Sequence, residues 1–509
     1  MKIKKILDLD KLSSLVAKYK KRKRKIVLCH GVFDLLHLGH IKHFEEAKKH
    51  GDVLIVTVTP DDYVYKGPNK PLFSLQQRIE TLAALQTIDF VAANKWESAI
   101  ETIKIVKPNI YCKGPDYKDN SLDYTKKILE EKKAIKSIGG KIEYTSDETI
   151  FSSSNILNKF GDVYSDNQKS IIQKINKKLN FKQINKMIDE LKNLKVLVIG
   201  ETIIDQYYFC EALGKSGKEP ILVLRDLNME QYPGGAAAVA RHISGFCKSV
   251  TLLSMLGENG EYKNYIKNSL PKNINTEFIY KKDSPTIVKK KYVETYSKTK
   301  IFGVHNINDE LLGKKNEREF GKKLSKLIPK HDLIMLTDYG HGLISDKSAK
   351  SICKKSLFLA LNAQVNASNI GYHTMDKYKN VECVVINETE LRHETRNKNS
   401  PIKLLMKKLA RKLKIKNLIV TQGSQGSTLF TANAKKYYSS VAFASKIVDK
   451  VGAGDAMLAA VSLCLKNNFD KNFSLLVASL AAAQSVETIG NSVPINKNKI
   501  LKSIQYLLK

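Results

Sequence analysis

Two histidines three residues apart, His37 and His40, have Gly31 before them and Gly39 between them, in the stretch CHGVFDLLHLGHIKHF. If a helix begins between them, both imidazoles lie at its N-terminus, where unpaired N–H groups and the helix dipole attract anions. Glycines let a phosphate approach the backbone closely, and imidazoles can stabilise the charge of a leaving pyrophosphate. Metal binding would need a third ligand such as His43, and no H-E-x-x-H motif is present. The spacing favours phosphate binding.

A second chemically promising stretch is DKVGAGDAMLAA, Asp449–Ala460, in which a Gly-Ala-Gly turn leads into an apolar helix. The backbone N–H groups of Gly452, Ala453 and Gly454 can form an anion hole for a phosphoryl group in transfer. Asp455 is placed to accept a proton from an attacking hydroxyl. A helix N-cap after a glycine turn would give the same local sequence, so the motif alone leaves both roles open.

Each of these stretches requires a sheet to position it. KIVLCHGVFD and KVLVIGETIID are continuous apolar runs that end in glycine and then an acid, as expected of the first buried parallel strand of an α/β domain. The polar stretch between them has a helical pattern. We therefore expect a first domain over residues 1–160, a helical linker over 161–193 and a second domain over 194–509.

The fold expected for both domains is α/β and doubly wound. Further strands are predicted at GDVLIVTVTPDD, IDFVAAN and PNIYCKG, with helices at SLQQRIETLAAL and ESAIETIKIV. Strands and helices that alternate at this spacing build a parallel sheet, whose ligands bind beyond the carboxyl ends of the strands. The histidine pair falls at that edge.

The composition narrows the class of protein. Apolar residues make up 42% and charged residues 27%, as in ordinary globular proteins, and no apolar run is long enough for a membrane span. The start, MKIKKILDLDKL, lacks the apolar core of a signal peptide. Seven scattered cysteines without a C-x-x-C pair fit free thiols in a reducing cytoplasm.

A net charge of +34 raises the alternative of a basic nucleic-acid-binding protein. The lysines are spread evenly, and the one dense run, KYKKRKRK at Lys18–Lys25, is expected to be a solvated face. The motifs around His37, His40 and Asp455 also argue against a protein that only binds nucleic acid, because binding alone requires neither motif. We therefore expect small-molecule substrates, with nucleic acid a less favoured partner.

The first domain resembles the cytidylyltransferase-type nucleotidyltransferases, through G-x-F-D-x-x-H-x-G-H from Gly31 to His40. KGPDY resembles the K-G-G-D-Y of sugar-phosphate adenylyltransferases with Pro115 replacing a glycine, FSSSNIL resembles their Ser/Thr-rich phosphate segment, and PLFSLQQRIETLAAL their active-site arginine segment. The resemblance implies catalytic roles for His37, His40 and Lys113. It implies nucleotide binding by Gly31, Phe33, Asp34, Gly39, Lys66, Arg78, Asp116, Ser152, Ser153 and Ser154.

The second domain resembles the ribokinase-like (PfkB) sugar kinases, through YPGGAAAVARHI, NETE, LIVTQGSQG and the G-A-G-D motif. The resemblance implies a catalytic base at Asp455, Mg²⁺ organised by Glu390, a small β lid that often forms a homodimer surface, and a sugar site. The sugar site would contain Asp205, Gly234, Gly235 and Lys289. Nucleotide contacts would come from Asn387, Thr421, Gly423, Gly426, Gly452, Ala453 and Gly454.

Both domains occur together in the bifunctional heptose enzymes of lipopolysaccharide-precursor synthesis, a heptose-7-phosphate kinase joined to a heptose-1-phosphate adenylyltransferase, where the kinase comes first. The resemblance implies MgATP-dependent phosphorylation of a sugar or sugar phosphate, and nucleotidyl transfer from ATP or CTP to a sugar or polyol phosphate. Three departures lie on the sugar and phosphate side: Ala238 replaces an asparagine, Val451 replaces a threonine, and an Asp-Pro-Lys triplet is missing. They indicate a different sugar-like substrate or, as an alternative, a diverged kinase domain beside a cytidylyltransferase for a non-heptose polyol phosphate.

Overall fold

The computed structural model describes residues 5–64, 71–114, 127–145, 165–444 and 446–508. Two compact units are present. The first comprises Met1–Ile172, Leu179–Asn185 and Leu501–Lys509, and the second comprises Gln173–Lys178 and Lys186–Ile500.

The first unit is built on a five-stranded parallel sheet with the order β3-β2-β1-β4-β5. Its strands are β1 (Ile26–Gly31), β2 (Val53–Val58), β3 (Phe90–Ala93), β4 (Ile110–Lys113) and β5 (Lys141–Tyr144). Its helices are α1 (Leu9–Lys21), α2 (Leu38–Lys49), α3 (Leu75–Ala84), α4 (Ile100–Val106) and α5 (Lys127–Ser137).

Helices cover both faces of this sheet, which explains why its central strands β1 and β2 are almost continuously apolar. Ile26 and Leu28 of β1 point into a cluster with α1, α4 and α5, whereas Val27 and Cys29 point into a cluster with α2 and α3. Side chains alternate between the two faces of a strand, so a continuous apolar run is required where helices cover both.

The second unit has a nine-stranded sheet with the order β10-β9-β6-β13-β14-β15-β16-β17-β18, parallel except for β17 and β18. Its strands are β6 (Lys195–Gly200), β9 (Ser249–Gly257), β10 (Ile274–Lys281), β13 (Leu333–Asp338), β14 (Leu359–Ala363), β15 (Cys383–Asn387), β16 (Asn417–Thr421), β17 (Ser427–Thr431) and β18 (Lys436–Ser440).

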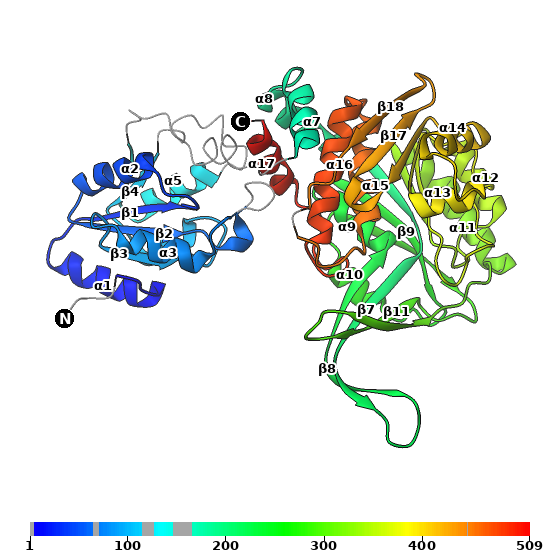
Figure 1. The fold of residues 1–509 in the computed structure, drawn as a ribbon, viewed down its shortest axis with the longest axis horizontal. Helices are drawn as coiled ribbons and strands as arrows, with labels where there is room; N and C mark the ends of the chain where they lie inside the picture. The colour runs from blue at the N-terminus through cyan, green and yellow to red at the C-terminus, as the bar shows by residue number, and fades with distance from the viewer. Residues whose placement is uncertain (1–4, 65–70, 115–126, 146–164, 445, 509) are drawn as a thin grey trace. The chain divides into compact units, whose positions relative to one another are not determined.

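Helices flank this sheet as well (Figure 1). They are α9 (Ala236–Ser244), α10 (Lys263–Ser269), α11 (Lys314–Leu327), α12 (Asp346–Lys355), α13 (Glu388–Thr395), α14 (Ile402–Leu413), α15 (Ala453–Lys466) and α16 (Lys471–Val486). Two further helices, α7 (Asp166–Asn176) and α8 (Phe181–Glu190), precede β6, and α17 (Lys497–Leu507) ends the described chain. None of the helices in the described residues is long and apolar enough to span a membrane.

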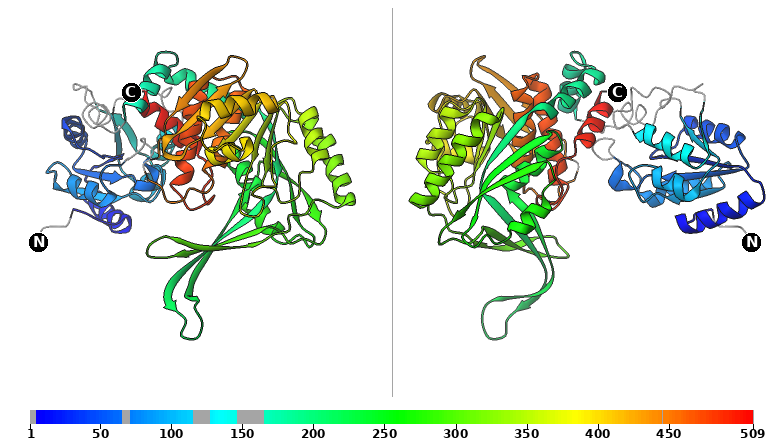
Figure 2. Two further views of the ribbon diagram at one scale, coloured as in Figure 1. Left: turned by 45° about the vertical axis from the view of Figure 1, so that its right-hand side comes forward. Right: turned by 180° about the vertical axis from the view of Figure 1, so that it is seen from behind.

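A four-stranded sheet with the order β12-β11-β7-β8 forms a lid on the second unit. Its strands are β7 (Thr202–Lys215), β8 (Leu222–Gly235), β11 (Val288–Glu294) and β12 (Lys300–Asn306). The hairpin of β7 and β8 extends beyond the rest of the lid in every view (Figures 1 and 2). Two doubly wound α/β units, the second with a small β lid, confirm the fold class expected from the sequence.

Candidate active sites

The strand order of the first unit reverses between β1 and β4, which are neighbours at its centre. Ligands of doubly wound sheets bind beyond the carboxyl ends of the strands at such a switch point. β1 ends at Gly31, β4 ends at Lys113, and α2 begins at Leu38 after His37 as its N-cap. The predicted phosphate-binding histidines therefore lie where the topology favours a ligand.

His37 and His40 lie side by side, with their ring centroids 4.0 Å apart. Nδ1 of His37 accepts a hydrogen bond of 3.1 Å from the backbone N–H of Gly39, which caps the helix and fixes the ring. The neutral ring then carries its proton on Nε2, the tautomer that can donate to an anion. The ring of His40 lies edge-on to Phe33, with centroids 5.5 Å apart. The structure thus brings both histidines together at a helix N-terminus.

Gly31 has a packing role in this loop. A Cβ on Gly31 would lie 2.9 Å from the ring of Phe33, which itself has a positive φ of 51°. Only glycine leaves room for that ring. Contact of these two residues with a nucleotide stays a prediction.

Asp34 and Arg78 fasten the loop after β1 to the segment before α3. The Asp34 carboxylate accepts the backbone N–H groups of Leu72 and Phe73 at 2.9 and 3.0 Å. The guanidinium of Arg78 is buried and donates to the carbonyls of Val32, Phe73 and Thr59, as well as to the Asp61 carboxylate. These contacts give both side chains a structural task beside the predicted nucleotide binding.

Lys113 is buried at the end of β4, and its ammonium lies 3.3 Å from the Glu131 carboxylate on α5. Glu131 also accepts the backbone N–H of Ala99 at 3.1 Å and the hydroxyl of Tyr111 at 3.0 Å. Burial opposes the ionisation of Glu131, but the charge of Lys113 prevails and lowers its pKa. Lys113 is thus held toward α5 by an ion pair that its sequence motif does not indicate.

Two more histidines lie in this domain, one on β1 and one on α2. Nδ1 of His30 lies 3.0 Å from the Thr57 hydroxyl, and Nδ1 of His43 lies 2.9 Å from the Thr145 hydroxyl. Burial, helped by the charge of Lys113, lowers the pKa of each to about 4. Within the described residues no group of three His, Cys, Asp or Glu side chains could hold a metal ion.

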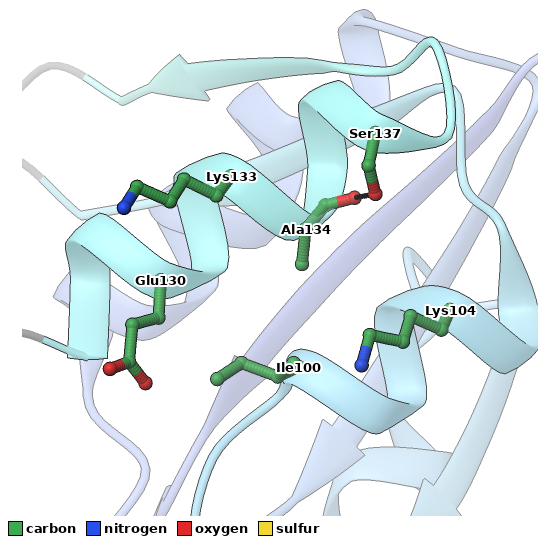
Figure 3. Close-up of a pocket in the computed structure, with 6 residues that line it drawn as sticks. All are labelled: Ile100, Lys104, Glu130, Lys133, Ala134 and Ser137. Carbon is green, nitrogen blue, oxygen red and sulfur yellow. Dashed lines mark hydrogen bonds between the residues drawn. The ribbon is translucent and has the colours of Figure 1, made fainter.

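Five predicted site residues fall outside the described residues: Lys66, Asp116, Ser152, Ser153 and Ser154. A shallow groove between α4 and α5, shown in Figure 3, is lined by Ile100, Lys104, Glu130, Lys133, Ala134 and Ser137. It includes none of the residues predicted to act in catalysis.

In the second unit the predicted base lies in the first turn of α15. The Tyr339 hydroxyl donates to Oδ1 of Asp455 at 2.9 Å. Burial, reinforced by the charge of Asp205, raises the pKa of Asp455 to about 7, although hydrogen bonds from Tyr339 and Asn491 oppose the shift. A carboxylate with a pKa near neutrality is suited to accept a proton from a hydroxyl.

The segment Asp449–Gly454, here called the anion loop, turns the chain into α15. Gly452 caps the helix with a φ of 90°, and a Cβ there would lie 2.2 Å from Oδ1 of Asn491, so only glycine fits. Gly454, by contrast, faces open space. The first N–H groups of a helix have no intrahelical acceptors, so this turn can offer donors to a phosphoryl group.

Asn387 and Glu390 form a capping box at the start of α13: each side chain accepts the other residue's backbone N–H at 2.8 Å. Burial raises the pKa of Glu390 to about 7, and the charge of Asp455 adds to the shift. Mg²⁺ in kinase sites is bound mainly by nucleotide phosphates and water, with one or two carboxylates. The Asp455 charge reaches Glu390, whose role at Mg²⁺ stays a prediction.

Thr421 ends β16, and a tight turn with Gly423 (φ 59°) and Gly426 (φ 91°) leads into β17. A Cβ on Gly426 would lie 2.0 Å from the Ser440 carbonyl oxygen. The turn explains both glycines, and their contact with ATP stays a prediction.

The predicted sugar-binding residues lie on the lid strands β7, β8 and β11. A Cβ on Gly234 would lie 2.1 Å from the Asp205 carboxylate, and Gly235, with a φ of 59°, starts α9. Asp205 bonds the Lys291 ammonium at 2.6 Å. Lys289 pairs in register with Asp205, and its burial lowers its pKa. Lys291, on the same strand as Lys289, was missed by sequence reasoning.

His341, another residue that sequence reasoning passed over, is fully buried near this cluster. Its Nδ1 lies 2.6 Å from Asp309, and its Nε2 has no hydrogen-bond partner within the described part of the chain. Burial, followed by the charge of Lys289, lowers its pKa to about 4.

Ala238 is buried in α9, and Val451 donates its N–H to Asp449 at 3.1 Å. Nothing in the described residues explains why these two positions depart from the kinase pattern.

Two protein-family models match this chain. A cytidylyltransferase-like model matches residues 28–159, the region of the histidine pair. A pfkB family carbohydrate kinase model matches residues 193–498, more than half of the chain. The chain belongs to the pfkB family of carbohydrate kinases. Its nucleotidyltransferase-like domain precedes the kinase domain, which is the order expected from the sequence.

Several curated relatives share the name bifunctional protein HldE. The bifunctional protein HldE of Sulfurimonas denitrificans is 37% identical over 138 residues, which is 27% of this chain and 29% of the relative. The protein of the same name from Geobacter metallireducens is 35% identical over 164 residues, 32% of each chain. The one from Campylobacter jejuni is 26% identical over 316 residues, 61% of this chain and 65% of the relative. The first two matches span about a third of the relatives' length.

Solved structures support the kinase fold alone. Phosphofructokinase-2 from Escherichia coli, in a potassium complex, superposes with a TM-score of 0.51 at 17% identity, over 62% of this chain and 100% of the other. A mutant of that enzyme gives the same TM-score at 16% identity and the same coverage.

Proposed function

We propose that this pfkB family member is a bifunctional enzyme of activated-sugar synthesis for a surface glycan or lipopolysaccharide precursor. Its kinase domain phosphorylates a sugar or sugar phosphate with ATP, and its nucleotidyltransferase-like domain couples a sugar or polyol phosphate to a nucleotide with release of pyrophosphate. The observation that carries the proposal is the presence of two separate phosphate-handling constellations: His37 and His40 at the N-terminus of α2, and Asp455 in the first turn of α15.

In the first domain, the phosphate of the sugar attacks the α-phosphorus of the nucleotide, and pyrophosphate leaves. His37, as the Nε2–H tautomer, and His40 donate to the phosphate oxygens on which charge accumulates. The N-terminus of α2 adds its dipole. No covalent intermediate is needed, because positioning and charge neutralisation lower the barrier.

In the kinase domain, Asp455 accepts the proton of the attacking sugar hydroxyl while that oxygen bonds to the γ-phosphorus and ADP leaves. The N–H groups of Gly452, Ala453 and Gly454 face the transferred group. Asp205, Gly234, Gly235 and Lys289 hold the sugar, and Glu390 and Asn387 serve the metal–phosphate side. Mg²⁺ bound with ATP neutralises phosphate charge.

We propose ATP as the nucleotidyl donor, because KGPDY resembles the adenylyltransferase motif, with CTP as the alternative. The decisive experiment is a screen of pyrophosphate release from ATP and CTP against sugar and polyol phosphates, run beside a screen of ADP release against hexose 6-phosphates, heptose 7-phosphates and free sugars. The proposal expects one NTP-dependent and one ATP-dependent activity. Salt-sensitive RNA binding without any NTP turnover would overturn it.

A homodimer through the lid completes the proposal. Large apolar side chains on the lid strands are exposed, including Leu222, Met229, Phe302 and Val304. An aromatic row, in which Tyr208 and Phe302 stack on either side of Tyr292 with centroids 5.0 and 4.6 Å apart, lies on the same outer face. Exposed apolar patches of this kind mark interaction surfaces. Phe302→Asp should convert a dimer to a monomer in light scattering, and a wild-type monomer would contradict this part.

We also propose a cytoplasmic location. ATP is available there, and all seven cysteines are free, as expected in a reducing compartment.

A further inference from the structure

One face of the lid carries a chain of polar side chains that runs from the sugar site to the anion loop. Asp205 and Tyr207 alternate on β7, and each pairs in register with a lysine of β11, Lys289 and Lys291 respectively. Alternate residues of a strand share a face, so these four side chains lie together.

Tyr207 joins the two ends of this chain. The Lys291 ammonium donates to the Asp205 carboxylate at 2.6 Å and to the Tyr207 hydroxyl at 3.3 Å. The Tyr207 hydroxyl in turn donates to Oδ2 of Asp449 at 2.9 Å. Lys291 donates, both carboxylates accept, and the Tyr207 hydroxyl accepts from Lys291 while it donates to Asp449, so the path from Asp205 to Asp449 is unbroken.

Asp449 is the residue that braces the anion loop. Its carboxylate accepts the backbone N–H groups of Val451 and Gly490, each at 3.1 Å, and an ammonium from Lys300 on β12. Tyr207 is fully buried, and a Cβ on Gly490 would lie 2.6 Å from its hydroxyl. The loop that would receive the phosphoryl group is therefore tied to the lid through one carboxylate.

We propose that Tyr207 is a positioning residue that couples substrate binding at Asp205 to the order of the anion loop. This rests on the proposed kinase function. A sugar hydroxyl that bonds Asp205 competes with Lys291 for that carboxylate. Lys291 then shifts its bonding toward the Tyr207 hydroxyl, which strengthens the bond of Tyr207 to Asp449. The anion loop is ordered most tightly when both lid and substrate are in place, which limits phosphoryl transfer to water.

The test uses Tyr207→Phe in the full chain, with Tyr208→Phe as the matched control. The control removes a hydroxyl from the next residue, whose ring lies on the opposite face and stacks on Tyr292. ADP formation is measured with and without the sugar selected by the substrate screen. Tyr207→Phe should lower kcat with sugar roughly tenfold, the scale of one hydrogen bond to a charged group, and should leave the KM for ATP and the sugar-independent rate unchanged.

Hydrogen exchange supplies a readout that does not need turnover. The amides of Val451 and Gly490 should exchange roughly tenfold faster in Tyr207→Phe than in Tyr208→Phe, since one hydrogen bond to Asp449 is lost. Equal kcat and equal exchange in the two variants would overturn the inference, as would a lower melting temperature with unchanged kcat. If the wild type phosphorylates no sugar, the kinase proposal fails, and the exchange rates of these two amides still decide whether Tyr207 orders the loop.

Discussion

The Tyr339 hydroxyl donates a 2.9 Å hydrogen bond to Oδ1 of Asp455, from a ring that is 3% exposed. The backbone N–H of Tyr339 is itself held at 3.0 Å by the buried Glu201 carboxylate. The tyrosine is thus fixed at both ends, and the proposed base is oriented from the carboxyl end of β13.

This bond stabilises the charged form of Asp455, so Tyr339→Phe should raise the pKa of Asp455 above its value of about 7. A base must be deprotonated to act, so the acid limb of the kcat profile of the kinase should move to higher pH. The rate loss should be largest below about pH 7 and small two units above it. An acid limb that stays where it is in the wild type would show that the hydrogen bond does not tune the base.

Asp455→Asn keeps the shape of the side chain but cannot accept a proton. Phosphoryl transfer should fall by roughly two to four orders of magnitude, as expected when a general base is lost. ATP affinity should barely change. Calorimetric titration of ATP beside the rate measurement separates the two effects, and a wild-type rate would leave Asp455 only a structural role in the first turn of α15.

The same substitution should alter stability in a pH-dependent way. The folded pKa of Asp455, about 7, lies above its ordinary value of 3.8, so ionisation of this carboxyl costs folding free energy as pH rises between those values. The melting temperature of Asp455→Asn should therefore exceed that of the wild type at about pH 8. At about pH 4 the two melting temperatures should be equal. A melting temperature that is lower than the wild type's in the alkaline sample would contradict the burial argument.

His37→Ala and His40→Ala should each lower pyrophosphate release by roughly a hundredfold or more, the usual result of losing a transition-state donor. Kinase activity, measured in the same preparation as ADP formation, serves as the internal control and should persist. Near-normal nucleotidyl transfer in both variants would remove the histidines from the mechanism.

Lys113 offers a test of structural against catalytic function. Lys113→Met leaves Glu131 charged and buried without its partner, which should cost roughly 3–5 kcal/mol of unfolding free energy. Adding Glu131→Gln should restore most of that stability, measured by urea unfolding. If Lys113 contacts phosphate as its motif predicts, the double variant is stable but slow. A stable double variant with full pyrophosphate release would assign Lys113 to the fold alone.

The sequence indicated most of the fold because the signals were local. The apolar run before Gly31 marked β1, and the glycines at 452 and 454 marked the turn into α15. Tyr207 and Lys291 were missed because their roles depend on pairing between β7 and β11, strands separated by more than 70 residues. No local pattern specifies such a register, and the three consecutive lysines at 289–291 look alike in sequence.

That lysine run also bears on how this lid could evolve. A slip of one residue between β7 and β11 would turn Lys290 toward Asp205 in place of Lys289, so the charge opposite the carboxylate would survive. The neighbour of Tyr207 would then be Tyr292, and its ring would leave the outer aromatic row for the sugar site. The pairing of β11 with β7, by contrast with its pairing with β12, is regular over its whole length. A one-residue slip would therefore keep a lysine opposite Asp205. It would, however, destroy the division of the lid into a polar face and an aromatic face.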